Sequence, residues 1–168
     1  MSRRLLRHPL GWLATGLGSG LAPVAPGTAG SIASLIPAWY LLDQPLLWLL
    51  LWCLLLPLGV WSGGWANRQL NSHDSGCIVI DEWAGQWLTL LPSVWLWPNW
   101  FALPQHAIAG FLLALVLFRV TDIVKPWPAS WADGKVHGGL GVMLDDLLAA
   151  VWSAILMLIC LWLWQTYR

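Results

Sequence analysis

Charged residues are scarce in this sequence. Of its 168 residues only 10% are charged, whereas 58% are hydrophobic; a soluble domain usually carries about 25% charged residues. The eight basic and eight acidic residues cancel, so no net field draws the chain as a whole to nucleic acid or to an anionic surface. The composition therefore predicts an integral membrane protein that binds lipid and no nucleic acid.

Cysteine is also scarce, and one familiar phosphate-binding motif is missing. The three cysteines are widely spaced and two of them lie inside apolar runs, which excludes a disulfide framework and a cysteine metal site. The segment Gly27-Thr28-Ala29-Gly30-Ser31 lacks the lysine that a Walker-type loop needs after its second glycine. A nucleotide-binding loop of that type is therefore excluded.

Long apolar runs are plentiful. A helix that spans the hydrocarbon core needs roughly 20 mostly apolar residues, and three segments meet this plainly: 46–65, 101–118 and 147–164. Two further segments, 28–42 and 83–97, are shorter, and the apolar part of the first covers only 32–42. Each would cross the membrane fully, cross half of it, or enter and return on the same side. The sequence thus predicts one domain over 1–168, an all-α polytopic membrane helical bundle with about five membrane segments.

The basic residues predict the orientation of these segments. Lys and Arg concentrate on the cytoplasmic side of membrane proteins. With the N-terminus inside and five crossings, all basic residues but Arg168 lie on that side: Arg3, Arg4, Arg7, Arg68, Arg119, Lys125 and Lys135. Tryptophans such as Trp39, Trp95 and Trp164 would form an aromatic belt near the opposite face. We expect a multi-pass membrane protein whose polar segments open to the cytoplasm.

Three polar stretches remain between the spans, at 16–31, 67–82 and 119–146, and this topology opens all of them to the cytoplasm. The glycines and prolines of the first predict a shaped loop. Its unpaired N–H groups and the hydroxyls of Thr28 and Ser31 would face an anion. The alternative is a simple capping turn with Thr28 or Ser31 as the N-cap.

The other two stretches are rich in carboxylates. Asp81 and Glu82 precede one apolar segment, and Asp145 and Asp146 are expected to head the last span after a flexible approach at 137–141. Acidic residues at a helix start suit its dipole. Carboxylates at membrane depth, however, cost about 2.5 to 3.5 kcal/mol each, so adjacent pairs call for a cation.

Asp122 and Lys125 stand three residues apart at the end of another span, and they would share one helix face. A surface ion pair is the simpler reading of that spacing, and Asp133 is expected in a turn beyond it. The five carboxylates Asp81, Glu82, Asp122, Asp145 and Asp146 would then meet at one depth and hold Mg²⁺. Arg119 and Lys125 would neutralise a phosphate, and the cytoplasmic His73 and His137 are further candidates.

These blocks resemble the phosphatidylglycerophosphatase A family. The resemblance spans nearly the whole chain and is carried by GSGLAPVAPGTAGS, HDSGCIVIDEWAGQW, FRVTDIVKPWP and VHGGLGVMLDDLLAA. It implies a bacterial inner-membrane enzyme that carries out Mg²⁺-dependent hydrolysis of phosphatidylglycerophosphate to phosphatidylglycerol and inorganic phosphate. The family's acidic positions carry over onto the same five carboxylates, and its phosphate-loop positions carry over onto Thr28 and Ser31.

The mechanism predicted on this basis places Mg²⁺ on Asp81, Asp122 and Asp146. Glu82 or Asp145 completes the metal shell or acts as the base, while Lys125, Arg119 and His137 bind phosphate. The alternative from another class is a cation- or proton-coupled transporter that uses the acidic cluster. A phosphotransferase that uses a nucleotide-activated lipid is disfavoured because its Asp-x-x-Asp-Gly-x-x-Ala-Arg block is absent. The oligomeric state is left open.

Overall fold

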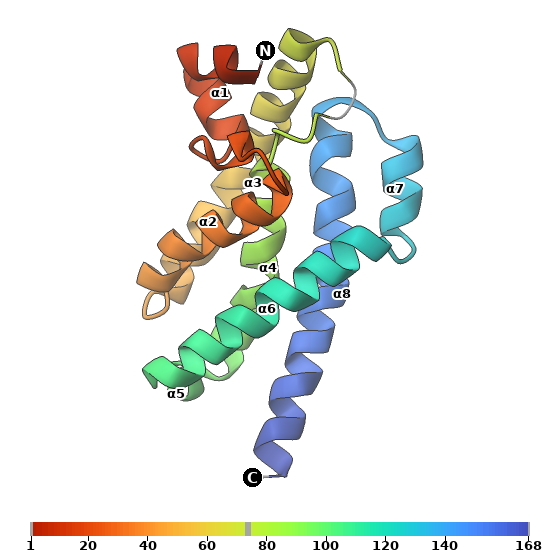
Figure 1. Cartoon of the computed structure of the whole chain (residues 1–168). Coiled ribbons are helices and arrows are strands. Elements are labelled where there is room, and N and C mark those ends of the chain that lie inside the picture. Colours follow the sequence, from red (N-terminus) through yellow and green to blue (C-terminus); the bar gives the residue numbers. More distant parts are fainter. Residues whose placement is uncertain (1, 73–74, 168) are drawn as a thin grey trace.

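The computed structural model of this protein describes residues 2–72 and 75–167, and this part of the chain is helical without any β-strand. The all-α prediction is therefore confirmed. The long helices are α2 Pro26–Tyr40, α3 Pro45–Leu70, α4 Ile80–Leu96, α6 Pro104–Val124 and α8 Gly138–Thr166 (Figure 1). The shorter elements are α1 Pro9–Ala14, α5 Pro98–Phe101, α7 Ala129–Lys135 and two 3₁₀ helices, η1 Ser2–Arg7 and η2 Ser19–Leu21.

Among the described residues, α3, α6 and α8 are long and apolar enough to cross a membrane, with 26, 21 and 29 residues. They contain most of the three long segments predicted from the sequence. Large apolar side chains such as Leu50, Leu54 and Val116 are exposed on them, as lipid contact requires and water would not favour. The two short predicted segments correspond to α2 and α4, which have 15 and 17 residues.

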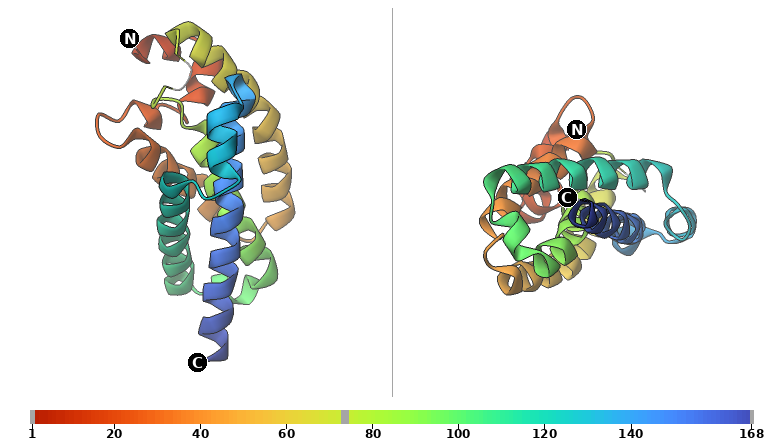
Figure 2. Two further views of the ribbon diagram at one scale, coloured as in Figure 1. Left: turned by 90° about the vertical axis from the view of Figure 1, so that its right-hand side faces the viewer. Right: turned by 90° about the horizontal axis from the view of Figure 1, so that it is seen from below.

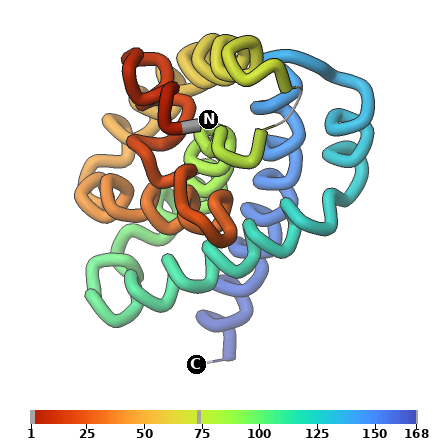
Figure 3. Tube along the Cα trace, turned by 45° about the horizontal axis from the view of Figure 1, so that its top comes forward, coloured from red at the N-terminus to blue at the C-terminus, as the bar shows by residue number. Residues whose placement is uncertain are grey.

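Helix α4 is the centre of the bundle. It contacts α2, α3, α6 and α8, and Figure 3 shows these four helices surrounding it. The two ends of the chain lie at opposite ends of the molecule (Figures 1 and 2). The starts of α2, α4 and α8 and the end of α6 lie toward the same end as the N-terminus, so their polar residues can meet there.

Tryptophan hydrogen bonds fix the position of α4 against its neighbours. The indole N–H of Trp52 on α3 donates to the carbonyl of Ala84 at 2.9 Å, and that of Trp87 donates to the carbonyl of Ser34 on α2 at 2.8 Å. The backbone N–H of Val79 donates to the carbonyl of Ala14 at 2.9 Å. Interhelical hydrogen bonds in membranes contribute about 0.6 kcal/mol each, and together these contacts fix where the first turn of α4 lies.

Three local predictions were wrong. The stretch 16–31 is not a loop throughout, because η2 lies within it and α2 already begins at Pro26; proline is well suited to the first helical position. Helix α8 begins at Gly138, so 137–141 is no flexible approach and Asp145 and Asp146 lie two turns inside the helix. Packing has overridden the low helix propensity of the glycines there.

Two further boundaries differ from expectation. Asp133 lies on α7 and not in a turn. The apolar run at 101–118 is divided, because Phe101 belongs to α5 and α6 starts at Pro104. Helix α6 then continues to Val124, so Arg119 and Asp122 lie within the helix and Lys125 follows directly after it.

Candidate active site

A cavity of about 660 Å³ opens where α4, α6, α7 and α8 meet. All five predicted carboxylates line it, together with Lys125, Asp133 and His137. The structure thus brings together the acidic residues of three separate sequence blocks. Of the remaining predicted site residues, Arg119 adjoins the cavity through ion pairs and Ser31 contacts Arg119.

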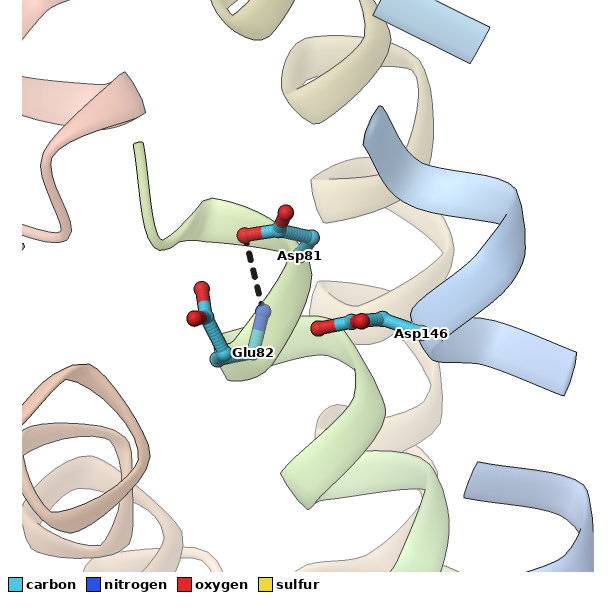
Figure 4. A group of neighbouring side chains, drawn as sticks. All are labelled: Asp81, Glu82 and Asp146. Atoms are coloured by element: carbon cyan, nitrogen blue, oxygen red, sulfur yellow. Dashed lines mark hydrogen bonds between the residues drawn. The ribbon is translucent and has the colours of Figure 1, made fainter. Parts of the chain in front are cut away.

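Asp81, Glu82 and Asp146 form the tightest carboxylate group in the cavity. Each offers one oxygen, and these oxygens lie within 4.8 Å of one another. Asp81 and Glu82 come from the first turn of α4, and Asp146 extends toward them from α8 (Figure 4). Asp81 and Asp146 are only 9% and 4% exposed. We refer to these three residues as the carboxylate triad.

Gly85 lets α8 approach α4 closely enough to complete the carboxylate triad. A Cβ atom at Gly85 would lie 3.3 Å from the carbonyl oxygen of Asp146 and 2.5 Å from the ring of Phe118. A side chain one turn after Glu82 would therefore push α6 and α8 away. Within the triad, the backbone N–H of Glu82 donates to Asp81 Oδ1 at 3.0 Å.

Arg119 closes the cavity on the side of α2 and α6. Its Nη1 lies 2.9 Å from Asp122 Oδ2 and 3.9 Å from Glu82 Oε1, and it donates a long hydrogen bond of 3.5 Å to Ser31 Oγ. The Arg119 side chain is 19% exposed. Asp122 thus holds the guanidinium beside the triad and is not itself part of it.

Lys125 serves the opposite side of the cavity. It follows α6 with a left-handed φ of 45°, and its Nζ donates to Asp133 Oδ1 at 2.6 Å and to Asp145 Oδ2 at 2.5 Å. The simpler alternative, a surface ion pair between Asp122 and Lys125, was wrong, because the left-handed turn directs the Lys125 side chain to α7 and α8. Burial lowers the pKa of Lys125, but the hydrogen bonds and charges of Asp133 and Asp145 outweigh burial and raise it overall.

The first turn of α2 lies against Glu82 and Arg119. A Cβ atom at Gly27 would lie 2.3 Å from Glu82 Oε1 and 3.2 Å from Arg119 Nη2. Ser31 is buried and donates to the carbonyl of Gly27 at 3.0 Å. Ala25 is the N-cap, so the reading of Thr28 or Ser31 as the N-cap was wrong.

His137 is the N-cap residue of α8 and lines the cavity from its exposed rim. Its Nδ1 lies 3.2 Å from the carbonyl oxygen of Lys135. His73, the other candidate histidine, lies outside the described residues. The sequence did not predict that Asp133 accepts a hydrogen bond from Lys125, because nothing in the sequence shows that α7 folds back onto Lys125.

The donor set fits a hard divalent cation. All of the triad's ligand atoms are carboxylate oxygens, the type that Mg²⁺ prefers. Glu82 Oε2 and Asp145 Oδ1 are buried without a hydrogen-bond partner in the described part of the chain. Buried carboxylates in such proximity repel one another unless a cation offsets their charge.

Comparison with known proteins identifies similar sequences over nearly the whole chain. Residues 12–161 match the family model described as Phosphatidylglycerophosphatase A. A Phosphatidylglycerophosphatase A of Escherichia coli is 42% identical over 157 residues, covering 91% of this chain and 84% of that protein. The protein of the same name from Haemophilus influenzae is 36% identical over 152 residues, covering 89% and 87%.

A third relative, from Bacteroides thetaiotaomicron, is 38% identical over 161 residues, covering 89% of this chain and 92% of that protein. It carries the provisional name of a phosphatidylinositol-3-phosphatase. No solved structure matches the chain at a significant level.

Proposed function

Because the chain belongs to the phosphatidylglycerophosphatase A family, we propose that it hydrolyses phosphatidylglycerophosphate to phosphatidylglycerol and inorganic phosphate. The cofactor is Mg²⁺, and the reaction takes place at the cytoplasmic face of a bacterial inner membrane. The observation that carries this proposal is the carboxylate triad, which lies between two basic side chains at the ends of membrane helices.

Asp81, Glu82 and Asp146 hold the cation in this proposal. A Mg²⁺ ion bound there supplies the usual chemistry of metal-assisted hydrolysis, activation of water and compensation of phosphate charge. The sequence-based prediction that Asp122 and Asp145 are also ligands stays a prediction. In the described structure these two carboxylates bind Arg119 and Lys125.

The basic groups bind the substrate's phosphate. Arg119 offers a planar guanidinium suited to two phosphate oxygens, and the first-turn N–H groups of α2 at Gly27 and Thr28 add the positive end of a helix dipole. Lys125 and His137 approach from the other side of the cavity. Together they offset the charge that develops on the transferred phosphoryl group.

Asp145 is placed to handle the proton. Its Oδ2 accepts from Lys125, and its buried Oδ1 has no partner among the described residues. During hydrolysis the water oxygen attacks phosphorus and the bond to the glycerol oxygen breaks. Asp145 accepts the proton that the water loses, and the leaving alkoxide on the opposite side of the phosphorus takes its proton from solvent.

Phosphate release by the purified protein tests the proposal. The substrates are phosphatidylglycerophosphate, phosphatidic acid and phosphatidylinositol 3-phosphate, each with Mg²⁺ and with EDTA. We expect release from phosphatidylglycerophosphate that EDTA abolishes and added Mg²⁺ restores. Faster phosphate release from another lipid would overturn the proposed substrate. Phosphate release that is insensitive to EDTA would overturn the proposed metal site. Ion flux in liposomes without phosphate release would favour the transporter.

A further inference from the structure

The seam between α2 and α6 leads from the candidate active site to an apolar groove. At the end of the seam nearest the active site, Arg119 Nη1 of α6 lies 3.5 Å from Ser31 Oγ of α2. Gly27 of α2 lies against the side chains of Arg119 and Glu82. Any ligand that reaches Arg119 along this seam would be one side chain away from the carboxylate triad. The seam therefore joins the polar site to the lipid-facing surface.

Farther along the same two helices the surface is hollowed. A groove of about 420 Å³ is lined by Leu35, Ile36, Trp39, Tyr40, Ile108, Phe111 and Leu112. The rings of Trp39 and Phe111 meet edge to face across it, 5.4 Å apart. Figure 1 shows α2 and α6 sloping the same way with opposite chain directions, so that the end of α2 and the start of α6 both lie away from the end of the bundle that holds the acidic residues.

The groove begins about one lipid headgroup away from Arg119. Leu112 is seven residues before Arg119 on α6, which is about 10 Å at 1.5 Å per residue, and Ile108 is about 16 Å away. On α2, Leu35 is one helical turn beyond Ser31. Between these points the seam shows apolar side chains, including Ile32 and Val116, which are 50% and 59% exposed.

We propose that this groove binds an acyl chain of the phosphate lipid while Arg119 and the start of α2 hold its headgroup. The inference rests on the proposed function and adds the path by which substrate is held. The Arg119 guanidinium beside the active site is complementary to an anionic lipid headgroup. The apolar groove farther along the same two helices is complementary to the acyl chain attached to that headgroup. The substrate thus enters sideways from the bilayer between α2 and α6.

The groove is tested directly by photo-crosslinking. Full-length protein in phosphatidylcholine nanodiscs receives phosphatidylglycerophosphate with a diazirine at the end of one acyl chain. After illumination we expect labelled peptides from 35–40 and 108–112, and we expect unlabelled phosphatidylglycerophosphate to abolish the labelling while phosphatidylglycerol competes less. Labelling spread over α3 and α8, or labelling that no lipid phosphate displaces, would show ordinary surrounding lipid and overturn the inference.

Filling the groove gives a second test. Leu112→Trp should raise KM for the long-chain substrate about tenfold, or roughly 1.4 kcal/mol of lost binding, and leave kcat within about twofold. A short-chain analogue should be hydrolysed normally by this variant. Ile155→Trp on the exposed face of α8 is the matched control and should match wild type on both substrates.

The outcomes separate this inference from the proposed function. If the wild-type protein releases phosphate and Leu112→Trp affects long-chain and short-chain substrates equally, the proposed function stands and acyl-chain binding in the groove is overturned. A changed oligomeric mass in Leu112→Trp, measured by native mass spectrometry, would assign the groove to a second copy of the chain. Wild-type protein that hydrolyses none of the lipid phosphates would overturn the proposed function itself.

Discussion

Asp145 and Asp146 are adjacent on α8, yet their carboxylates serve different partners. Asp145 Oδ2 accepts from Lys125 at 2.5 Å, whereas Asp146 offers an oxygen within 4.8 Å of Asp81 and Glu82. Successive residues on a helix point about 100° apart, so two neighbouring carboxylates can reach different groups in one cavity. Single substitutions of Asp145 and Asp146 can therefore test which of the two carboxylates binds the metal.

Asp146→Asn should weaken Mg²⁺ binding by more than about 100-fold, since even outer-shell changes cost 10- to 100-fold. Asp145→Asn should keep Mg²⁺ affinity and lower kcat by about 10² to 10⁴, the range for loss of a general base. The measurement is activity against Mg²⁺ concentration, supported by calorimetric metal titration. If both variants shift the Mg²⁺ requirement equally, Asp145 is a ligand as the sequence first suggested.

Lys125 joins α7 to α8 through Asp133 and Asp145. Lys125→Met should destabilise the protein by about 1 to 2 kcal/mol, within the range for hydrogen bonds to charged groups and reduced because the lysine is a quarter exposed. For a chain of this size that is a fall of roughly 2 to 8 °C in Tm. Lys135→Met, at an exposed position on α7, is the control and should leave Tm unchanged.

The difference in Tm between wild type and Lys125→Met should be insensitive to pH up to about 9.5. The pKa of Lys125 is raised above its ordinary value of 10.5, by hydrogen bonds and charges that outweigh burial. A group with a raised pKa in the folded state contributes its full stability below the unfolded pKa and loses it as pH rises through the folded pKa. A difference between wild type and Lys125→Met that vanishes between pH 7 and pH 9.5 would contradict this assignment.

Gly27 faces the tips of the Glu82 and Arg119 side chains, so a methyl group at this position would displace groups of the candidate active site. Gly27→Ala places a methyl group 2.3 Å from Glu82 Oε1, so either α2 or Glu82 must move. We expect a fall in kcat of about 10- to 100-fold, because small displacements of positioned groups cost about 10². Gly134→Ala on α7 meets no atom within 4 Å and should keep full activity. Normal activity in Gly27→Ala would show that the first turn of α2 plays no part.

The composition predicted the membrane bundle, and the sequence blocks predicted that the five carboxylates would come together, as they do around one cavity; their roles in catalysis stay predictions. The pairing of those residues could not be read from the sequence. Lys125 turns toward Asp133 and Asp145 only because α6 ends in a left-handed residue and α7 folds back. The close contact at Gly85 likewise depends on how α4, α6 and α8 pack.

The start of α8 shows why boundaries were harder to predict than spans. Glycines at 138, 139 and 141 suggested a flexible segment, since glycine costs about 1 kcal/mol in a helix interior. In the structure a Cβ atom at Gly141 would lie 2.2 Å from the carbonyl oxygen of Val136, so the glycine is needed for close packing at the start of the helix. The propensity scale carries no information on such a contact.

The topology predicts that Asn99 and Ser130 lie on opposite sides of the membrane. Both residues are exposed, Asn99 on α5 and Ser130 on α7, and α6 lies between them. Introduced singly as Asn99→Cys and Ser130→Cys in a background without Cys53, Cys77 and Cys160, they should react differently with a membrane-impermeant maleimide. In intact spheroplasts, position 99 should label and position 130 should label only after lysis, because the basic residues favour a cytoplasmic α7. Labelling of both from outside would break the five-segment arrangement, whereas the reverse pattern would keep it and invert the protein, placing the carboxylate triad on the periplasmic side.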